Sequence, residues 1–175
     1  MRTNLEVELN KFAKNVKQQS RSRLTKSGSN FSKNLYNSID YDLGVSNSGN
    51  SFSLSFEMED YGKFQDQGVR GAGGVRKTTS KFNSRNNKGK LWKIKGKNSP
   101  FKFGKSGGIS PKHFTEWAKS KGISPFAVAK VVYHQGIEPK KFFTTSFEQQ
   151  FKKLPEDLVK AFALDIDNLI NFSTK

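Results

Sequence analysis

The fold class is decided by residues 39–58, which read IDYDLGVSNSGNSFSLSFEM. Apolar and polar residues alternate over 39–45 and again over 52–58, with a Gly- and Asn-rich turn between the two runs. This period-two pattern predicts a β-hairpin with one apolar face. The residues expected on that face are Tyr41, Leu43, Val45, Phe52, Leu54 and Phe56. We expect helices to cover it, because an apolar sheet face must be buried.

Helical patterns flank this hairpin on both sides. Before it, apolar residues recur at helical spacing over 4–19 and again from Phe31 to Ile39. The inward-facing residues predicted for these two helices are Leu5, Leu9, Phe12, Val16, Phe31, Leu35 and Ile39. After the hairpin, Ser-Pro pairs at 110–111 and 124–125 predict two helix starts, because Ser caps a helix and Pro fits its first turn. The second of these helices is largely apolar, so we expect it to pack inside the protein and not to read DNA.

Two more helices are predicted after Pro139. The first carries Phe142, Phe143, Phe147 and Phe151, and the second starts at Pro155. The residues of the last helix expected to face the core are Leu158, Phe162, Ile166 and Leu169. Helices on one face of a small antiparallel sheet make an α+β fold, and 175 residues suffice for a single domain spanning 1–175.

The excess positive charge of the chain lies mostly in one segment. Residues 70–105 hold twelve Lys or Arg and no Asp or Glu, in a chain of net charge +16. A like-charge segment rich in Gly, Ser and Asn buries too little apolar surface to fold alone, so we predict a long basic arm or hairpin inserted in the domain. Within it, 90–95 is expected to form a short strand and 100–104 to return the chain to the folded body. The arm residues expected to contact partner proteins or DNA are Arg70, Arg76, Lys77, Lys81, Arg85, Lys88, Lys90, Trp92, Lys93, Lys95, Lys97, Lys102 and Lys105.

The sequence contains no pattern typical of catalysis or metal binding. There is no Cys, and His113 and His134 lie far apart without the spacing of metal ligands. The segment 104–106 reads Gly-Lys-Ser but lacks the Gly that a phosphate-binding loop has five positions earlier. Asp40 and Asp42 are interpreted as solvated residues of the hairpin's polar face. We therefore expect no enzyme activity, no catalytic residue, no metal and no cofactor.

The sequence gives no sign of membrane insertion. No apolar run approaches the ~18–20 residues of a transmembrane helix. Residues 1–6 lack the apolar stretch of a signal peptide. The lack of Cys fits a reducing compartment. We expect a protein that does not bind a membrane.

Four motifs, in order, resemble the tail-completion or head-tail joining proteins of tailed bacteriophages. They are a Leu35-to-Ile39 segment ending in Ser-Ile, the two strands, a Tyr-x-x-Phe-x-x-x-Gly turn at 61–68, and Pro-x-x-Phe at 139–142. The resemblance covers residues 1–71 and 136–170. The sequence departs from the family at Gln67, where an acidic residue is usual, and in a longer insert over 72–135.

The resemblance implies a structural role in the virion. It implies a subunit of a ring-shaped homo-oligomer in the phage neck or tail, joining the portal or connector to the tail around the DNA channel. Assembly would take place in the host cytoplasm. The residues that it assigns to the turn and the subunit interface are Tyr61, Phe64, Asp66, Gly68, Gly71, Pro139 and Phe142.

A non-specific nucleic-acid-binding protein is the alternative. Lys-rich sequence interleaved with Trp92 and Phe82 suits phosphate contact and base stacking. Salt separates the two hypotheses, because phosphate binding weakens steeply as salt rises and apolar ring contacts do not. Both roles are compatible in one protein if the arm faces packaged DNA.

The arm hypothesis predicts the result of a deletion. Residues 70–105 should be protease-sensitive in the isolated protein, and Trp92, Ile94, Phe101 and Phe103 should be buried against neighbours in the particle. Removing 72–104 should leave the body folded, as judged by circular dichroism, but block incorporation into particles. A deletion variant that still gives infectious virions at normal yield would show that the arm is dispensable.

Overall fold

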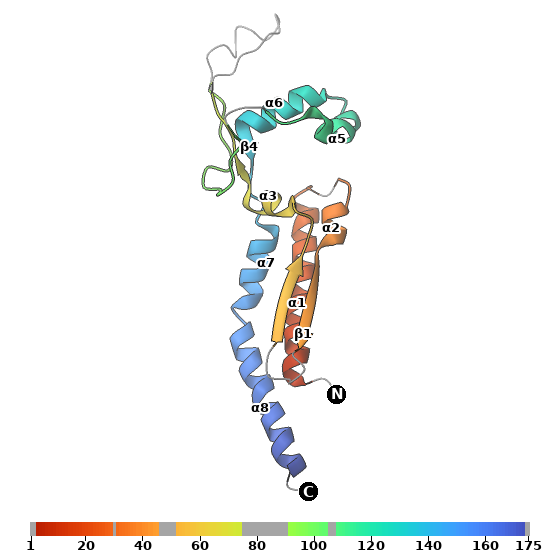
Figure 1. Cartoon of the computed structure of the whole chain (residues 1–175), viewed down its shortest axis with the longest axis vertical. Helices are drawn as coiled ribbons and strands as arrows, with labels where there is room; N and C mark the ends of the chain where they lie inside the picture. Colours follow the sequence, from red (N-terminus) through yellow and green to blue (C-terminus); the bar gives the residue numbers. More distant parts are fainter. Residues whose placement is uncertain (1–2, 30, 46–51, 75–90, 105–107, 174–175) are drawn as a thin grey trace, which may run out of the picture. The chain divides into compact units, whose positions relative to one another are not determined.

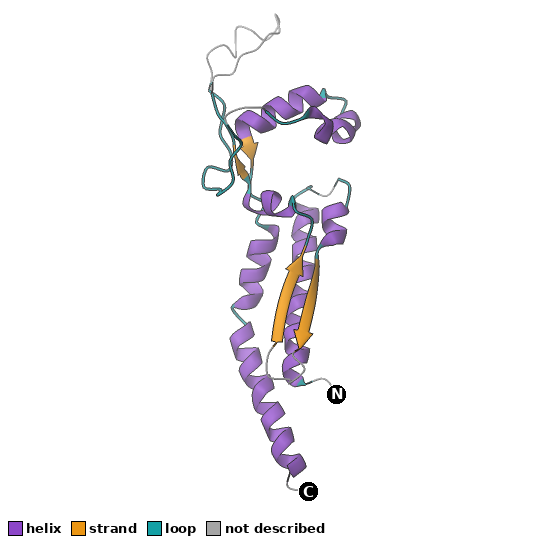
Figure 2. Cartoon of the chain, in the orientation of Figure 1, coloured by secondary structure: helices purple, strands orange, loops and turns teal. Residues whose placement is uncertain are grey.

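The computed structural model describes residues 3–29, 31–45, 52–74, 91–104 and 108–173, with no side-chain description for Val45 and 166–173. Its helices and antiparallel strand pairs confirm the predicted α+β class (Figures 1 and 2). The chain divides into two compact units. Unit 1 comprises residues 1–60 and 141–175, and unit 2 comprises residues 61–140. That the two units form the single domain expected from the sequence stays a prediction.

Unit 1 is built on helix α1 (Asn4–Lys26). Its start is capped by the Thr3 hydroxyl, which accepts a hydrogen bond from the Glu6 amide at 3.1 Å. The residues buried along one stripe of the helix are Phe12, Ala13, Val16, Ser20 and Leu24. The helix runs beyond the predicted 4–19 because Ser20 and Leu24 continue this stripe at helical spacing.

The predicted hairpin is confirmed, as β1 (Asp40–Val45) and β2 (Phe52–Glu57). Tyr41 lies opposite Phe56, and the other two predicted apolar pairs also lie opposite each other in the register. The Phe56 ring lies 6.4 Å from that of Phe12 on α1, measured between centroids, and 5.4 Å from that of Phe143 on α7 (Phe142–Phe151). Helices from both parts of unit 1 therefore cover the apolar face, as predicted.

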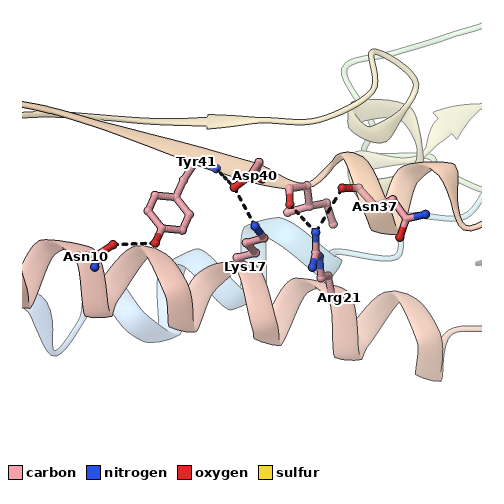
Figure 3. A network of polar contacts seen from close by, with 7 residues as sticks. Asn10, Lys17, Arg21, Asn37, Asp40 and Tyr41 are labelled. Carbon is pink, nitrogen blue, oxygen red and sulfur yellow. Dashed lines mark hydrogen bonds and ion pairs between the residues drawn. The ribbon is translucent and has the colours of Figure 1, made fainter.

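Polar contacts fasten the start of β1 to α1 (Figure 3). Lys17 Nζ donates to Asp40 Oδ1 at 2.8 Å, and this hydrogen bond is the main reason why the pKa of Asp40 lies below its ordinary value. The Tyr41 hydroxyl donates to Asn10 Oδ1 at 2.6 Å. Arg21 Nη2 donates to the carbonyl of Ile39 at 3.1 Å, just before the strand begins. These contacts set which part of β1 lies over which turn of α1.

The short helix α2 (Asn34–Ser38) completes the core of unit 1. Leu35 and Ile39 are buried as predicted, in one cluster with Leu24 and Phe142. The prediction for Phe31 is wrong, because this side chain is 55% exposed. Lys33 adopts a left-handed conformation directly before Asn34, so the helix begins only after Phe31.

Helix α8 (Leu154–Ser173) packs against α1. Its Asp165 accepts hydrogen bonds from the backbone amides of Asn4 and Leu5 at 2.9 and 3.0 Å. Burial raises the pKa of Asp165, but these hydrogen bonds outweigh it and the pKa lies below its ordinary value. Ala161 is buried, whereas Phe162, predicted to face the core, is 56% exposed. The α1 contact runs through Ala161 and Asp165, which are four residues apart, and Phe162 points away from that line.

Unit 2 contains short elements. They are α3 (Gly62–Gln67), β3 (Val69–Arg70), the 3₁₀-helix η1 (Pro111–Phe114), α5 (Thr115–Ser120), α6 (Pro125–Gln135) and β4 (Gly136–Ile137). Pro111 and Pro125 begin helices, as the Ser-Pro pairs predicted. The prediction that α6 is a packing helix is met on part of its surface only. Among its residues only Ala129 is buried, and Phe126 is 74% exposed, because η1, α5 and β4 contact only part of the helix.

The described part of the chain contains no helix that is both long and apolar enough to cross a bilayer.

Leu24 offers a test of the unit 1 core. Its side chain is fully buried, so Leu24→Ala should lower the free energy of unfolding by about 2–5 kcal/mol. The same change at Leu164, which is 55% exposed, should cost within about 0.5 kcal/mol. Urea unfolding followed by circular dichroism measures both. Equal losses in the two variants would contradict the placement of Leu24.

Candidate interaction surface

Four chain segments meet at the centre of unit 2. Strands β3 and β4 pair antiparallel, with Arg70 opposite Gly136. On one side, the Arg70 amide donates to the Phe101 carbonyl at 2.8 Å, and the Phe103 amide donates to the Arg70 carbonyl at 3.2 Å. On the other side, the Lys95 amide donates to the Gln135 carbonyl at 2.6 Å. Backbone hydrogen bonds thus tie 101–103 and Lys95 to the two short strands.

Glycines allow these backbones to approach closely. Gly136 has φ 88°, and a Cβ at this position would overlap the Val69 carbonyl oxygen and the Gly71 amide nitrogen. Gly71 lies against the backbone of His134 and Gln135 in the same way. Gly68 and Gly71, expected at a subunit interface, are therefore buried in unit 2, where they permit its own packing.

Trp92 is buried in the chain itself. It is 7% exposed and stacks on His134, with ring centroids 5.2 Å apart and planes 1° apart. His134 Nδ1 lies 2.7 Å from the Gly73 carbonyl oxygen. The imidazole therefore takes part in packing between the Trp ring and the backbone.

The segments 70–74 and 91–104 are packed against other parts of the chain and do not extend from the folded body as an arm over 70–105 would. Both pack within unit 2, because Arg70 lies in the hydrogen-bonded centre described above and the Trp92 amide donates to the Gly74 carbonyl at 3.1 Å. Deleting 72–104 would remove part of this centre, so the body expected to stay folded in that variant is unit 1 alone. The segment 91–104 carries four exposed Lys side chains, at Lys93, Lys95, Lys97 and Lys102. The expected contact residues that lie outside the described residues are Arg76, Lys77, Lys81, Arg85, Lys88, Lys90 and Lys105. The contact of all these residues with partners or DNA stays a prediction.

Positive charge is concentrated in unit 2. Residues 61–140 contain eighteen Lys or Arg and three Asp or Glu, so unit 2 carries +15 of the chain's +16. Of the three acids, Asp66 is 4% exposed and Glu138 lies 4.0 Å from Lys95. Unit 2 therefore has far more cations than its own carboxylates can neutralise.

An apolar cleft of about 510 Å³ opens on unit 2. Its aromatic lining comes from the 61–64 turn and from 101–103, with Val69 and Ile137 between them. Phe64 and Phe101 meet edge to face with centroids 4.8 Å apart. Lys102 also lines the cleft, and Lys63 Nζ lies 5.4 Å from the Phe64 ring centroid. The result is an aromatic recess bordered by cations, which suits an apolar side chain on an acidic partner.

The residues expected at a subunit interface differ in their surroundings. Tyr61 and Phe64 line the cleft and are available for contact. Phe142 and Asp66 are buried at 1% and 4% exposure, so neither side chain is available on the surface. Pro139 lies close to Gly68. The motif residues therefore shape the fold more than they offer a surface.

The described residues include no cluster of three His, Cys, Asp or Glu side chains able to hold a metal. His113 is exposed and His134 is stacked on Trp92. The expectation that the protein is not an enzyme stays a prediction.

The chain matches no protein-family model, no curated protein and no solved structure. The resemblance to phage tail-completion proteins therefore remains an expectation from the sequence motifs.

The cleft was not predicted from the sequence. Both of its aromatic segments are visible there, as Tyr-Gly-Lys-Phe at 61–64 and Pro-Phe-Lys-Phe at 100–103. The sequence does not show that these two segments lie side by side. They do so because Arg70 forms a parallel bridge with Lys102.

Gly136 offers a test of the close approach. Gly136→Ala should separate β3 from β4 and expose Trp92, whereas Gly122→Ala should not. Gly122 is a matched control because it also has positive φ, +65°, but nothing lies within 4 Å of an added Cβ. In a Trp117→Phe background, a red shift of Trp92 fluorescence reports the separation. A shift of equal size in both variants would contradict this account.

Proposed function

We propose that the protein is a structural subunit of a ring in the neck or tail of a tailed bacteriophage. In this role it joins the head side to the tail around the DNA channel, and its partners are further copies of itself and the adjoining virion proteins. The virion assignment is supported by the sequence motifs alone.

The observation that carries the assembly role is the uncovered apolar surface of both units. The aromatic cleft of unit 2 lies open, and Phe126 on α6 is 74% exposed. In unit 1, Val159 and Phe162 on α8 are 70% and 56% exposed. An open aromatic cleft and neighbouring exposed apolar residues on one helix mark interaction sites, whereas apolar residues exposed singly are common on any protein surface.

Nucleic-acid binding is a second candidate, favoured by the charge of unit 2. A net charge of +15 in eighty residues gives a strong field for phosphates. In a ring around DNA, the same charge would face the packaged molecule. Trp92 would not stack on bases in this role, because it is already stacked on His134.

Mass photometry of the purified protein across concentrations tests the first candidate. We expect species of several subunits, which electron microscopy should show as closed rings. A protein that stays monomeric up to the highest concentration, alone and with a portal protein, would contradict the ring.

A DNA titration tests the second candidate. Binding by unit 2 should weaken with salt at a log-log slope of about −0.9 per neutralised phosphate. A slope near zero would exclude phosphate contact as the basis of binding.

A further inference from the structure

One face of α8 is not covered by the other described residues of unit 1. Glu156, Val159 and Ala163 follow one another at helical spacing, and all three are exposed. Phe162 lies beside them and is 56% exposed. The packing of α8 on α1 uses Ala161 and Asp165 instead. We call the set Glu156, Val159, Phe162 and Ala163 the α8 outer face.

The charge of α8 is opposite to that of unit 2. Residues 154–173 contain four acidic residues and one Lys. Glu156 lies on the α8 outer face itself, next to exposed apolar side chains. The helix therefore combines apolar anchors with negative charge.

The aromatic cleft of unit 2 has complementary properties. Its walls are Phe64, Phe101 and Phe103, and exposed Lys63 and Lys102 border it. Its volume of about 510 Å³ is ample for an aromatic and an aliphatic side chain together. Few carboxylates of unit 2 compete for these cations, since Asp66 is buried and Glu138 lies beside Lys95.

We propose that the α8 outer face of one copy docks in the aromatic cleft of unit 2 of a second copy. Phe162 and Val159 enter the cleft, and Glu156 meets the cations at its border. The proposal rests on the ring-subunit function and names the contact that builds the ring. Because each copy carries one donor helix and one acceptor cleft, the contact is head-to-tail, and repeating it closes a ring if the rotation between copies allows.

A mixing experiment tests this arrangement. The donor-blocked variant is Val159→Asp/Phe162→Asp, and the acceptor-blocked variant is Lys63→Glu/Lys102→Glu, all at exposed positions. Each variant alone should associate at least roughly 30-fold more weakly than the unmodified protein, as expected for loss of a central contact. The two variants mixed should form heterodimers and nothing larger, because the pair retains one intact donor and one intact acceptor, used on each other. Native mass spectrometry measures the species.

Matched controls separate the contact from general effects of charge. Leu164→Asp introduces the same acid on the same helix, at a side chain that is 55% exposed. Leu164 is two residues from Phe162 and therefore lies on the other side of α8. Ile123→Asp places an acid on unit 2, at a side chain that is 46% exposed and does not line the cleft. Both should assemble as the unmodified protein does. Circular dichroism of all variants should be unchanged, and Phe162→Ala gives a milder donor variant if the double change unfolds α8.

The outcomes distinguish the contact from the function. Rings formed by the donor-blocked variant at normal yield would overturn the docking and leave the ring function standing. Binding of the unmodified cleft to DNA but not to a second copy, lost in the Lys63→Glu/Lys102→Glu variant, would also overturn the docking. Unmodified protein that never assembles would contradict both proposals.

Discussion

The apolar stripe of α1 is the surface on which unit 1 depends. The hairpin reaches it through the contact of Phe56 with Phe12, and α7 reaches it through the contact of Phe147 with Phe12. Helix α8 packs on the same helix, where Asp165 accepts hydrogen bonds from the backbone amides of the first turn of α1. One helix therefore receives three partners on adjoining faces. A β-hairpin alone is marginal in water, so its stability comes from this shared contact.

Unit 2 is held together in a different way. Its buried apolar residues among those described are few: Val69, Trp92, Ala118 and Ala129. Its centre consists of backbone hydrogen bonds between segments that glycines bring together. Unit 1 should therefore tolerate conservative apolar changes, as packed cores do, whereas unit 2 offers no space for a Cβ at Gly71 or Gly136.

The sequence predicted the elements better than their surroundings. The hairpin and the Ser-Pro helix starts follow from local patterns, and the structure has them. Phe162 and Phe31 were misplaced because helical spacing identifies an apolar stripe but does not say whether another element covers it. Trp92 was assigned to an exposed arm because charge and glycine content describe a segment's average. Its stacking on His134, far away in sequence, is a tertiary contact. The cleft depends on a similar long-range pairing.

The insertion of unit 2 between β2 and α7 has a consequence for the order of folding during synthesis. The apolar face of the hairpin that carries Phe56 is fully covered only after α7 has been synthesised, because Phe143 on α7 contacts Phe56. The eighty residues of unit 2 are synthesised between β2 and α7. At a translation rate of about 5–20 residues per second, this delay is roughly 4–16 s. During that time α1 and the hairpin emerge from the ribosome with an uncovered aromatic surface, which is a target for chaperones and for aggregation. Late contacts with α7 and α8 would then complete the first unit, after the second has had time to form.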